Sequence, residues 1–163
     1  MHVLFLILMI SGTVFCQSTN VWRGITPLKS TREDVERILG KPVPLSIARH
    51  AGWYETKDGK VFVLYSTGPC NVNHEHGWNI PELTVISISY YPNTSPRLAD
   101  IKIDVSKFDK DPDPGSLNIV SYVNEAAGIG LDVDSTEDTV RTFLYFPESK
   151  YDRLMCKNIK AEK

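Results

Sequence analysis

The sequence predicts an α+β domain in which one short N-terminal helix packs on a mostly antiparallel sheet of about six or seven strands. Two observations lead to this fold class. One segment, about residues 30–39, combines helical periodicity with capping residues at both ends. Most of the segments that follow alternate apolar with polar residues and are separated by turn residues, which is typical of antiparallel strands.

The first residues of the chain differ from the rest. An apolar run from Val3 to Ile10 leads into small and polar residues, and no acidic residue occurs in residues 1–16. The run is too short to span a bilayer, so residues 1–16 predict a signal peptide and a secreted or periplasmic protein. A lipid anchor at Cys16 is one alternative, although Phe15 is bulkier than the residue that lipid attachment prefers. A buried first strand or helix is the other alternative.

The remainder of the chain is expected to form a single domain over residues 17–157, followed by a flexible basic tail at 158–163. A hydrophobic content of 42% suffices for one core. With 18 basic and 20 acidic residues, the net charge of -2 gives no attraction toward nucleic acid or an anionic membrane. No other segment is apolar enough to cross a membrane, so the mature protein is expected to have no transmembrane segment.

The helix at about 30–39 is predicted with defined ends. Ser30 is the expected N-cap, and Glu33 is expected to complete a capping box. Gly40 and Pro42 are expected to end the helix. Three apolar residues at helical spacing predict the buried face: Val35, Ile38 and Leu39. Three charged residues are expected to face water: Arg32, Glu36 and Arg37.

The period changes to two after the helix. Residues 53–66 predict a β-hairpin with Asp58 and Gly59 at its turn. Residues 83–91 are rich in β-branched and aromatic side chains and predict a further strand.

The second half of the chain is expected to continue the sheet. Residues 100–108 alternate like a half-buried strand, whereas residues 109–115 contain two prolines and a glycine and predict an exposed loop. Residues 117–147 predict a three-stranded meander with turns at 125–128 and 135–138.

Removal of the signal peptide would leave two cysteines, Cys70 and Cys156. In an oxidising compartment this count predicts one disulfide, because only one pairing is possible. The bond would close a loop of about 85 residues, which the chain-entropy model values at about 4–5 kcal/mol. Two free thiols are the alternative.

Cys70 is also close in sequence to His74 and His76, which suggests a metal site or a Cys-His nucleophile. The usual spacings of zinc ligands are absent, and a disulfide would remove the thiolate of Cys70. We therefore expect no catalytic residue, no cofactor and no metal, and His74 and His76 are the candidate ligands if a metal binds here. The alternative is a metal-dependent or hydrolytic secreted enzyme centred on Cys70, His74 and His76.

Two acidic stretches raise the possibility of a cation site. They contain Asp109, Asp111 and Asp113, and Asp132, Asp134 and Asp138. Neither stretch has the glycine and glutamate positions of an EF-hand loop. Aspartate is a favoured turn residue, so both stretches predict solvated turns.

The segment from Gly24 to Pro42 resembles the signature of the BamE/SmpA and β-lactamase-inhibitor-protein-like superfamily, in which a small polar N-cap begins a short helix before a sheet. The matching residues are Gly24, Ser30, Val35, Leu39, Gly40 and Pro42. A longer set of motifs is similar to the sequences of a group of small uncharacterised secreted bacterial proteins. The set includes YS.GPC and GWN.P..TVISI, in which a dot stands for any residue.

The superfamily resemblance implies a non-enzymatic protein that presents a sheet and loops to another protein. Together with the signal peptide, it leads us to expect a non-catalytic secreted or periplasmic module for protein interaction or envelope structure. The expected partner is another protein.

Overall fold

The structure, a computed structural model, describes residues 20–44, 49–70, 77–112 and 118–156. The predicted signal peptide at 1–16, with Cys16, and the predicted tail at 158–163 lie outside the described residues. An eight-residue α-helix and a seven-stranded sheet confirm the predicted α+β fold class.

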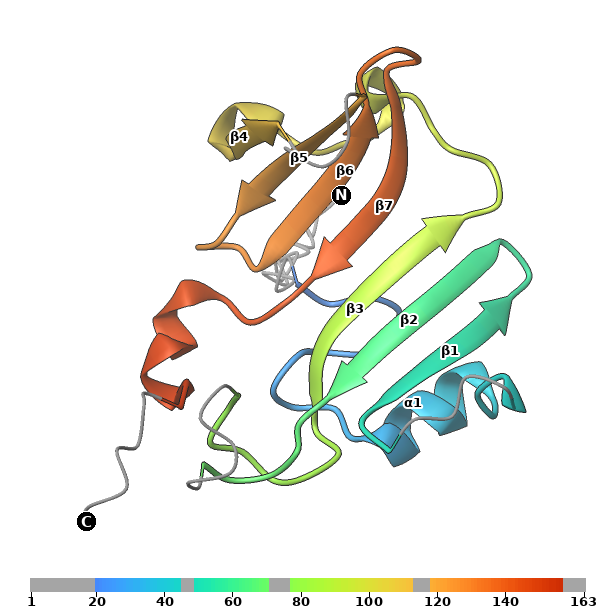
Figure 1. Cartoon of the computed structure of the whole chain (residues 1–163). Coiled ribbons are helices and arrows are strands. Elements are labelled where there is room, and N and C mark those ends of the chain that lie inside the picture. The colour runs from blue at the N-terminus through green and yellow to red at the C-terminus, as the bar shows by residue number, and fades with distance from the viewer. Residues whose placement is uncertain (1–19, 45–48, 71–76, 113–117, 157–163) are drawn as a thin grey trace, which may run out of the picture.

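All seven strands belong to one antiparallel sheet with the order β1-β2-β3-β7-β6-β5-β4 (Figure 1). The strands are β1 (Ala51–Thr56), β2 (Gly59–Tyr65), β3 (Val85–Pro92), β4 (Asp109–Pro112), β5 (Ile119–Asn124), β6 (Ile129–Asp134) and β7 (Thr139–Tyr145). The helices are α1 (Arg32–Leu39) and the short 3-10 helices η2 (Leu98–Asp100), η3 (Val105–Lys107) and η4 (Ser149–Leu154). The predicted meander is confirmed as β5, β6 and β7.

Helix α1 begins two residues later than the predicted start at residue 30, and its N-cap is Thr31 rather than Ser30. The Asp34 amide donates to the Thr31 hydroxyl at 3.3 Å, and the Thr31 amide donates to the Asp34 carboxylate at 2.9 Å. The Ser30 hydroxyl instead accepts from the Thr26 amide in the preceding turn. The prediction was wrong by one position because Ser30–Glu33 and Thr31–Asp34 fit the same capping pattern. Gly40 ends the helix at φ 85°, as predicted.

The buried face of α1 is narrower than predicted. Val35 is fully buried, but Ile38 is 42% exposed. Arg32, which was expected to face water, lies with its guanidinium carbon 5.6 Å from the centre of the Tyr65 ring. The Arg32 guanidinium also donates to Glu36 and to the carbonyl of Arg49, so its charge is partnered while it lies over the buried Tyr65 ring.

Two clusters of buried side chains form the core on one face of the sheet. The first lies under β1, β2 and β3 and includes Trp22, Ile25, Val35, Tyr54, Val61, Val63, Tyr65, Val85 and Ile88. Within it the hydroxyls of Tyr54 and Tyr65 are 2.6 Å apart, so each buried hydroxyl has a hydrogen-bond partner. The second cluster lies under β6 and β7 and comprises Leu131, Val133 and Val140.

The predicted strand at 100–108 is wrong. Residues 101–104 form no strand, and η2 and η3 lie on either side of them. The alternation has another cause, because Ile101, Ile103 and Val105 pack against the second core cluster. An extended segment that covers a sheet shows the same period of two as a strand that pairs within it.

The predicted loop at 109–115 is also wrong over its first residues. Asp109–Pro112 form β4, which pairs only with β5 at the edge of the sheet. Proline is tolerated on an edge strand because the position that lacks an amide hydrogen can face the side on which no strand follows. Asp113 lies outside the described residues.

The β1–β2 hairpin is confirmed, but its turn lies one residue earlier than predicted. Lys57 and Asp58 form the turn, and Gly59 already pairs with Thr56. A Cβ at Gly59 would lie 2.3 Å from the carbonyl oxygen of Tyr91. The glycine is therefore required by the close approach of β3.

The exposed turn residue Asp58 connects three segments: the N-terminal segment through Arg23, β1 through Thr56 and β3 through Tyr90. Its carboxylate accepts hydrogen bonds from the Arg23 guanidinium, from the Thr56 hydroxyl at 2.9 Å and from the Tyr90 hydroxyl at 3.1 Å. These donors, above all Arg23, lower the pKa of Asp58 to about 2.

The two faces of the sheet are covered differently (Figure 1). Residues 20–31 and the segment from 98 to 108 run behind the sheet in this view, on the side of the core clusters. No described helix or connecting segment crosses the front of the sheet. We call this front side the open face.

Thr31→Ala is expected to lower the free energy of unfolding by about 1 kcal/mol, because it removes the N-cap hydrogen bond. Glu33→Gln serves as control, because Ser30–Glu33 capping does not occur, and should change stability by less than about 0.5 kcal/mol. Urea denaturation measures both. A larger loss for Glu33→Gln than for Thr31→Ala would contradict the assigned cap.

The stabilisation by Asp58 is expected to depend on pH in the acid range. Its folded pKa of about 2 lies below the ordinary value of 3.8, so the contribution is complete above that value and is lost as the pH falls toward 2. Asp58→Asn should lose less stability over this interval than the parent protein does. Asp100→Asn removes an exposed carboxylate elsewhere and controls for net charge. Identical acid unfolding of the parent and Asp58→Asn would contradict this role.

Candidate functional site

Cys70 and Cys156 form a disulfide, with their Cα atoms 5.5 Å apart, as the cysteine count predicted. Backbone bonds flank it: the Cys156 amide donates to the Gly77 carbonyl at 2.8 Å, and the Asn79 amide donates to the Leu154 carbonyl at 2.7 Å. These contacts attach η4 to the segment that precedes β3. In this oxidised form the sulfur of Cys70 is neither a nucleophile nor a metal ligand.

The two histidines that follow Cys70, His74 and His76, lie outside the described residues. Within the described part of the chain, no group of three His, Cys, Asp or Glu side chains is arranged to hold a metal ion. The absence of a metal site at His74 and His76 stays a prediction.

In the acidic stretch near β6, the carboxylates of Asp132 and Asp134 accept hydrogen bonds from other groups of the protein. Asp134 accepts from the amides of Thr136 and Glu137 at 2.9 and 3.2 Å, and it pairs with Arg141 at 2.9 Å. Arg141, followed by these amides, lowers the pKa of Asp134. Asp132 accepts from the Ser121 hydroxyl at 2.7 Å. Asp134 thus caps the turn, as aspartate commonly does.

A surface pair that the sequence did not predict is formed by His50 and Glu82. The Nε2 atom of His50 lies 2.9 Å from a carboxylate oxygen of Glu82, and Arg49 reaches the same oxygen at 2.9 Å. These contacts, the one with His50 first, lower the pKa of Glu82. Among the described residues the His50 side chain hydrogen-bonds only to Glu82, so the pair lacks the nucleophile of a catalytic arrangement.

The open face carries a group of aromatic side chains, which we call the aromatic cluster: Trp53, Phe62 and Tyr91. Trp53 lies opposite Phe62 in the β1–β2 ladder, with ring centres 5.1 Å apart. The centres of the Trp53 and Tyr91 rings are 5.4 Å apart. Leu64 extends the apolar area, and Leu64 and Tyr91 are 38% and 37% exposed. Strand alternation places all four residues on the face opposite the core.

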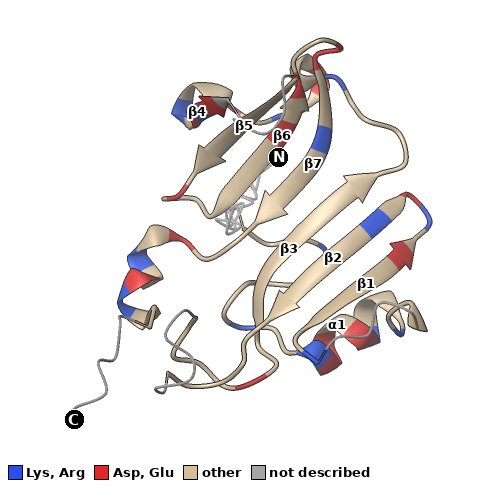
Figure 2. Ribbon diagram, viewed as in Figure 1, with Lys and Arg blue, Asp and Glu red and all other residues tan. Residues whose placement is uncertain are grey.

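Charged residues lie beside the aromatic cluster rather than within it. Figure 2 shows charges on β1, β2, β6 and β7 and none along β3. Glu55 and Lys60 face each other in the β1–β2 register at the margin of the cluster. The open face therefore combines an uncharged aromatic area with a margin of both signs.

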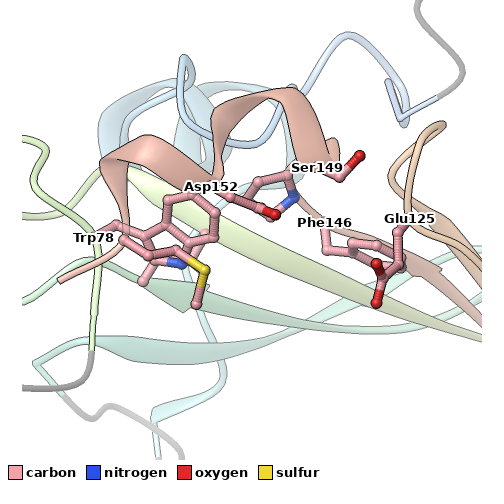
Figure 3. A pocket seen from close by; sticks show the side chains of 8 residues that line it. Trp78, Glu125, Phe146, Ser149 and Asp152 are labelled. Carbon is pink, nitrogen blue, oxygen red and sulfur yellow. The ribbon is translucent and has the colours of Figure 1, made fainter. Parts of the chain in front are cut away.

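A cavity of about 340 Å³ lies near the disulfide (Figure 3). Trp78 is at one end of the displayed side chains, Phe146 and Glu125 are at the other end, and Asp152 lies between them. The sequence does not predict this cavity, because its walls come from segments that are far apart in the chain. Patterns in one sequence do not indicate which distant segments come together to form a cavity.

Comparisons with known proteins find no matching family model, no matching curated protein and no matching solved structure. No helix in the part of the chain that the structure describes has the length and apolar character needed to cross a membrane.

Replacement of both Cys70 and Cys156 by serine is expected to lower the free energy of unfolding by about 4–5 kcal/mol. Without the cross-link the unfolded chain is no longer restricted by a long closed loop, so its conformational entropy rises. Thermal and urea unfolding measure the loss. Mass spectrometry after alkylation without reduction should find Cys70 and Cys156 unmodified. Alkylation of both residues under these conditions would contradict the bond.

Proposed function

We propose that the protein is a non-catalytic module of a secreted or periplasmic compartment that binds another protein through the open face of its sheet. The observation that carries this proposal is the aromatic cluster of Trp53, Phe62 and Tyr91, extended by the exposed Leu64. The disulfide supports the compartment, because such bonds persist mainly under oxidising conditions.

The composition of the open face favours a protein partner. Protein interfaces have charge-poor centres enriched in tryptophan, tyrosine and phenylalanine, with polar residues at the rim. Tryptophan and tyrosine are also the residues whose truncation most often costs binding energy. Here the aromatic cluster is the centre, and Glu55 and Lys60 are part of the rim.

The proposed occupant is a polypeptide surface with apolar side chains at its centre and charges of both signs at its margin. Apolar side chains would displace water from Leu64 and Tyr91, which are the most exposed members of the patch. A basic group opposite Glu55 and an acidic group opposite Lys60 would fix the orientation of the partner. A purely anionic partner, such as nucleic acid, would gain no comparable match.

The proposal agrees with the resemblance of Gly24–Pro42 to the BamE/SmpA and β-lactamase-inhibitor-protein-like superfamily. That resemblance implies proteins that present a sheet and loops to another protein. In this chain the early helix packs on the covered side through Val35 and leaves the opposite side of the sheet for the partner.

A photoreactive benzoyl-phenylalanine at position 62 should cross-link to one discrete protein in the envelope or secreted fraction of cells that naturally produce this protein. The same group at Lys29, an exposed position on the segment behind the sheet, should give no such product. Tyr91→Ser should lower the cross-linked yield about tenfold, as expected for loss of an interface anchor.

Ile38→Ser is the matched control, because Ile38 is similarly exposed at 42% but lies on α1. It should leave the yield unchanged. Equal products from positions 62 and 29, no product from position 62, or equal effects of Tyr91→Ser and Ile38→Ser would contradict the proposal.

A further inference from the structure

The cavity near the disulfide is built where the two halves of the sheet separate. The β3–β7 ladder ends at the Ile88–Tyr145 pair. Beyond that pair the two strands diverge. Ile86 from β3 and Phe146, which follows β7, both line the cavity. This site lies toward the start of β3, whereas Tyr91 of the open face lies at its end.

The apolar walls of the cavity are completed by Trp78 and Met155. A backbone bridge pairs these two residues, next to the hydrogen bond between Cys156 and Gly77. The disulfide therefore fixes one end of the cavity. The walls consist of an indole ring, a phenyl ring, a thioether and an aliphatic side chain, which together suit an apolar stem.

Among the described residues, the ionisable side chains that line the cavity are Glu125 and Asp152, which are both acidic. No lysine or arginine among the described residues lines it. Neither carboxylate has an ion-pair partner in the part of the chain that the structure describes, whereas nearby Glu148 is paired with Lys150. The cavity thus presents two unneutralised negative charges beside aromatic surfaces.

This combination selects a cation that is carried on an apolar stem. A guanidinium group pairs with carboxylates and also stacks on aromatic faces. The methylene stem of such a side chain is stabilised by contact with apolar surface while its charged end stays near water. A volume of about 340 Å³ is at the small end of ligand cavities, so it fits one side chain better than a large cofactor.

We propose that this cavity binds an arginine side chain of a polypeptide partner. The guanidinium lies between Glu125 and Asp152, and the stem packs on Trp78 and Phe146. The proposal goes beyond the protein-binding role of the open face, because it assigns a second site with its own chemistry. Loss of either site leaves the other in place.

The test is a nuclear magnetic resonance titration of the oxidised full chain with the blocked tripeptide acetyl-Gly-Arg-Gly-amide. Saturable shifts are expected at the Trp78 indole and at the amides of Gly77 and Met155. The matched probe contains citrulline, which has almost the same shape as arginine but no charge. It should bind about tenfold more weakly, because two exposed charge pairs are lost.

The double variant Glu125→Gln/Asp152→Asn should weaken binding of the arginine peptide by about tenfold and remove the preference over citrulline. The control Glu33→Gln/Asp100→Asn makes the same change in net charge away from the cavity and should bind like the parent. Shifts that do not saturate, shifts located elsewhere, equal binding of both peptides, or equal effects of the two double variants would overturn the proposal.

Discussion

The short ladder between β3 and β7 joins the two halves of the sheet and fixes where each half lies. Three residue pairs, from Ile88–Tyr145 to Tyr90–Phe143, join the β1–β3 half of the sheet to the β4–β7 half. Past the Ile88–Tyr145 end of this ladder, β3 and β7 diverge and leave the acidic cavity between them. On the covered side of the sheet, each half has its own buried cluster. The rings of Tyr90 and Phe143, 6.0 Å apart, connect the two clusters across the junction. The Cys70–Cys156 disulfide reinforces the same junction from outside the sheet, because it ties the segment before β3 to η4 after β7.

A second constraint is that a seven-stranded sheet has more surface than one eight-residue helix can cover. The chain covers one face with three segments: residues 20–31, α1 and residues 98–108. The opposite face receives no described segment and carries Trp53, Phe62 and Tyr91. An exposed apolar area costs solubility, so its presence on this small domain supports a partner that covers it.

The sequence predicted those parts of the structure that depend on neighbouring residues. The β1–β2 hairpin and the meander follow from alternation and turn residues, and the disulfide follows from a count that allows one pairing. The errors arose where a local pattern has two physical causes. Ile101 and Ile103 alternate because they cover the sheet, and the prolines of residues 109–115 did not exclude an edge strand. The β3–β7 ladder and the cavity could not be predicted, because they join segments more than fifty residues apart and no local signal records that pairing.

The two halves of the sheet should therefore form one cooperative unit, which keeps the open face and the cavity in fixed relative positions. Native-state hydrogen exchange of the oxidised protein measures this cooperativity. The hydrogen-bonded amides of the β3–β7 ladder should exchange through the same global opening, with the same free energy, as those in the centres of β2 and β6. Exchange of the ladder amides through a separate opening of lower free energy would show that the halves part independently, and would contradict the account.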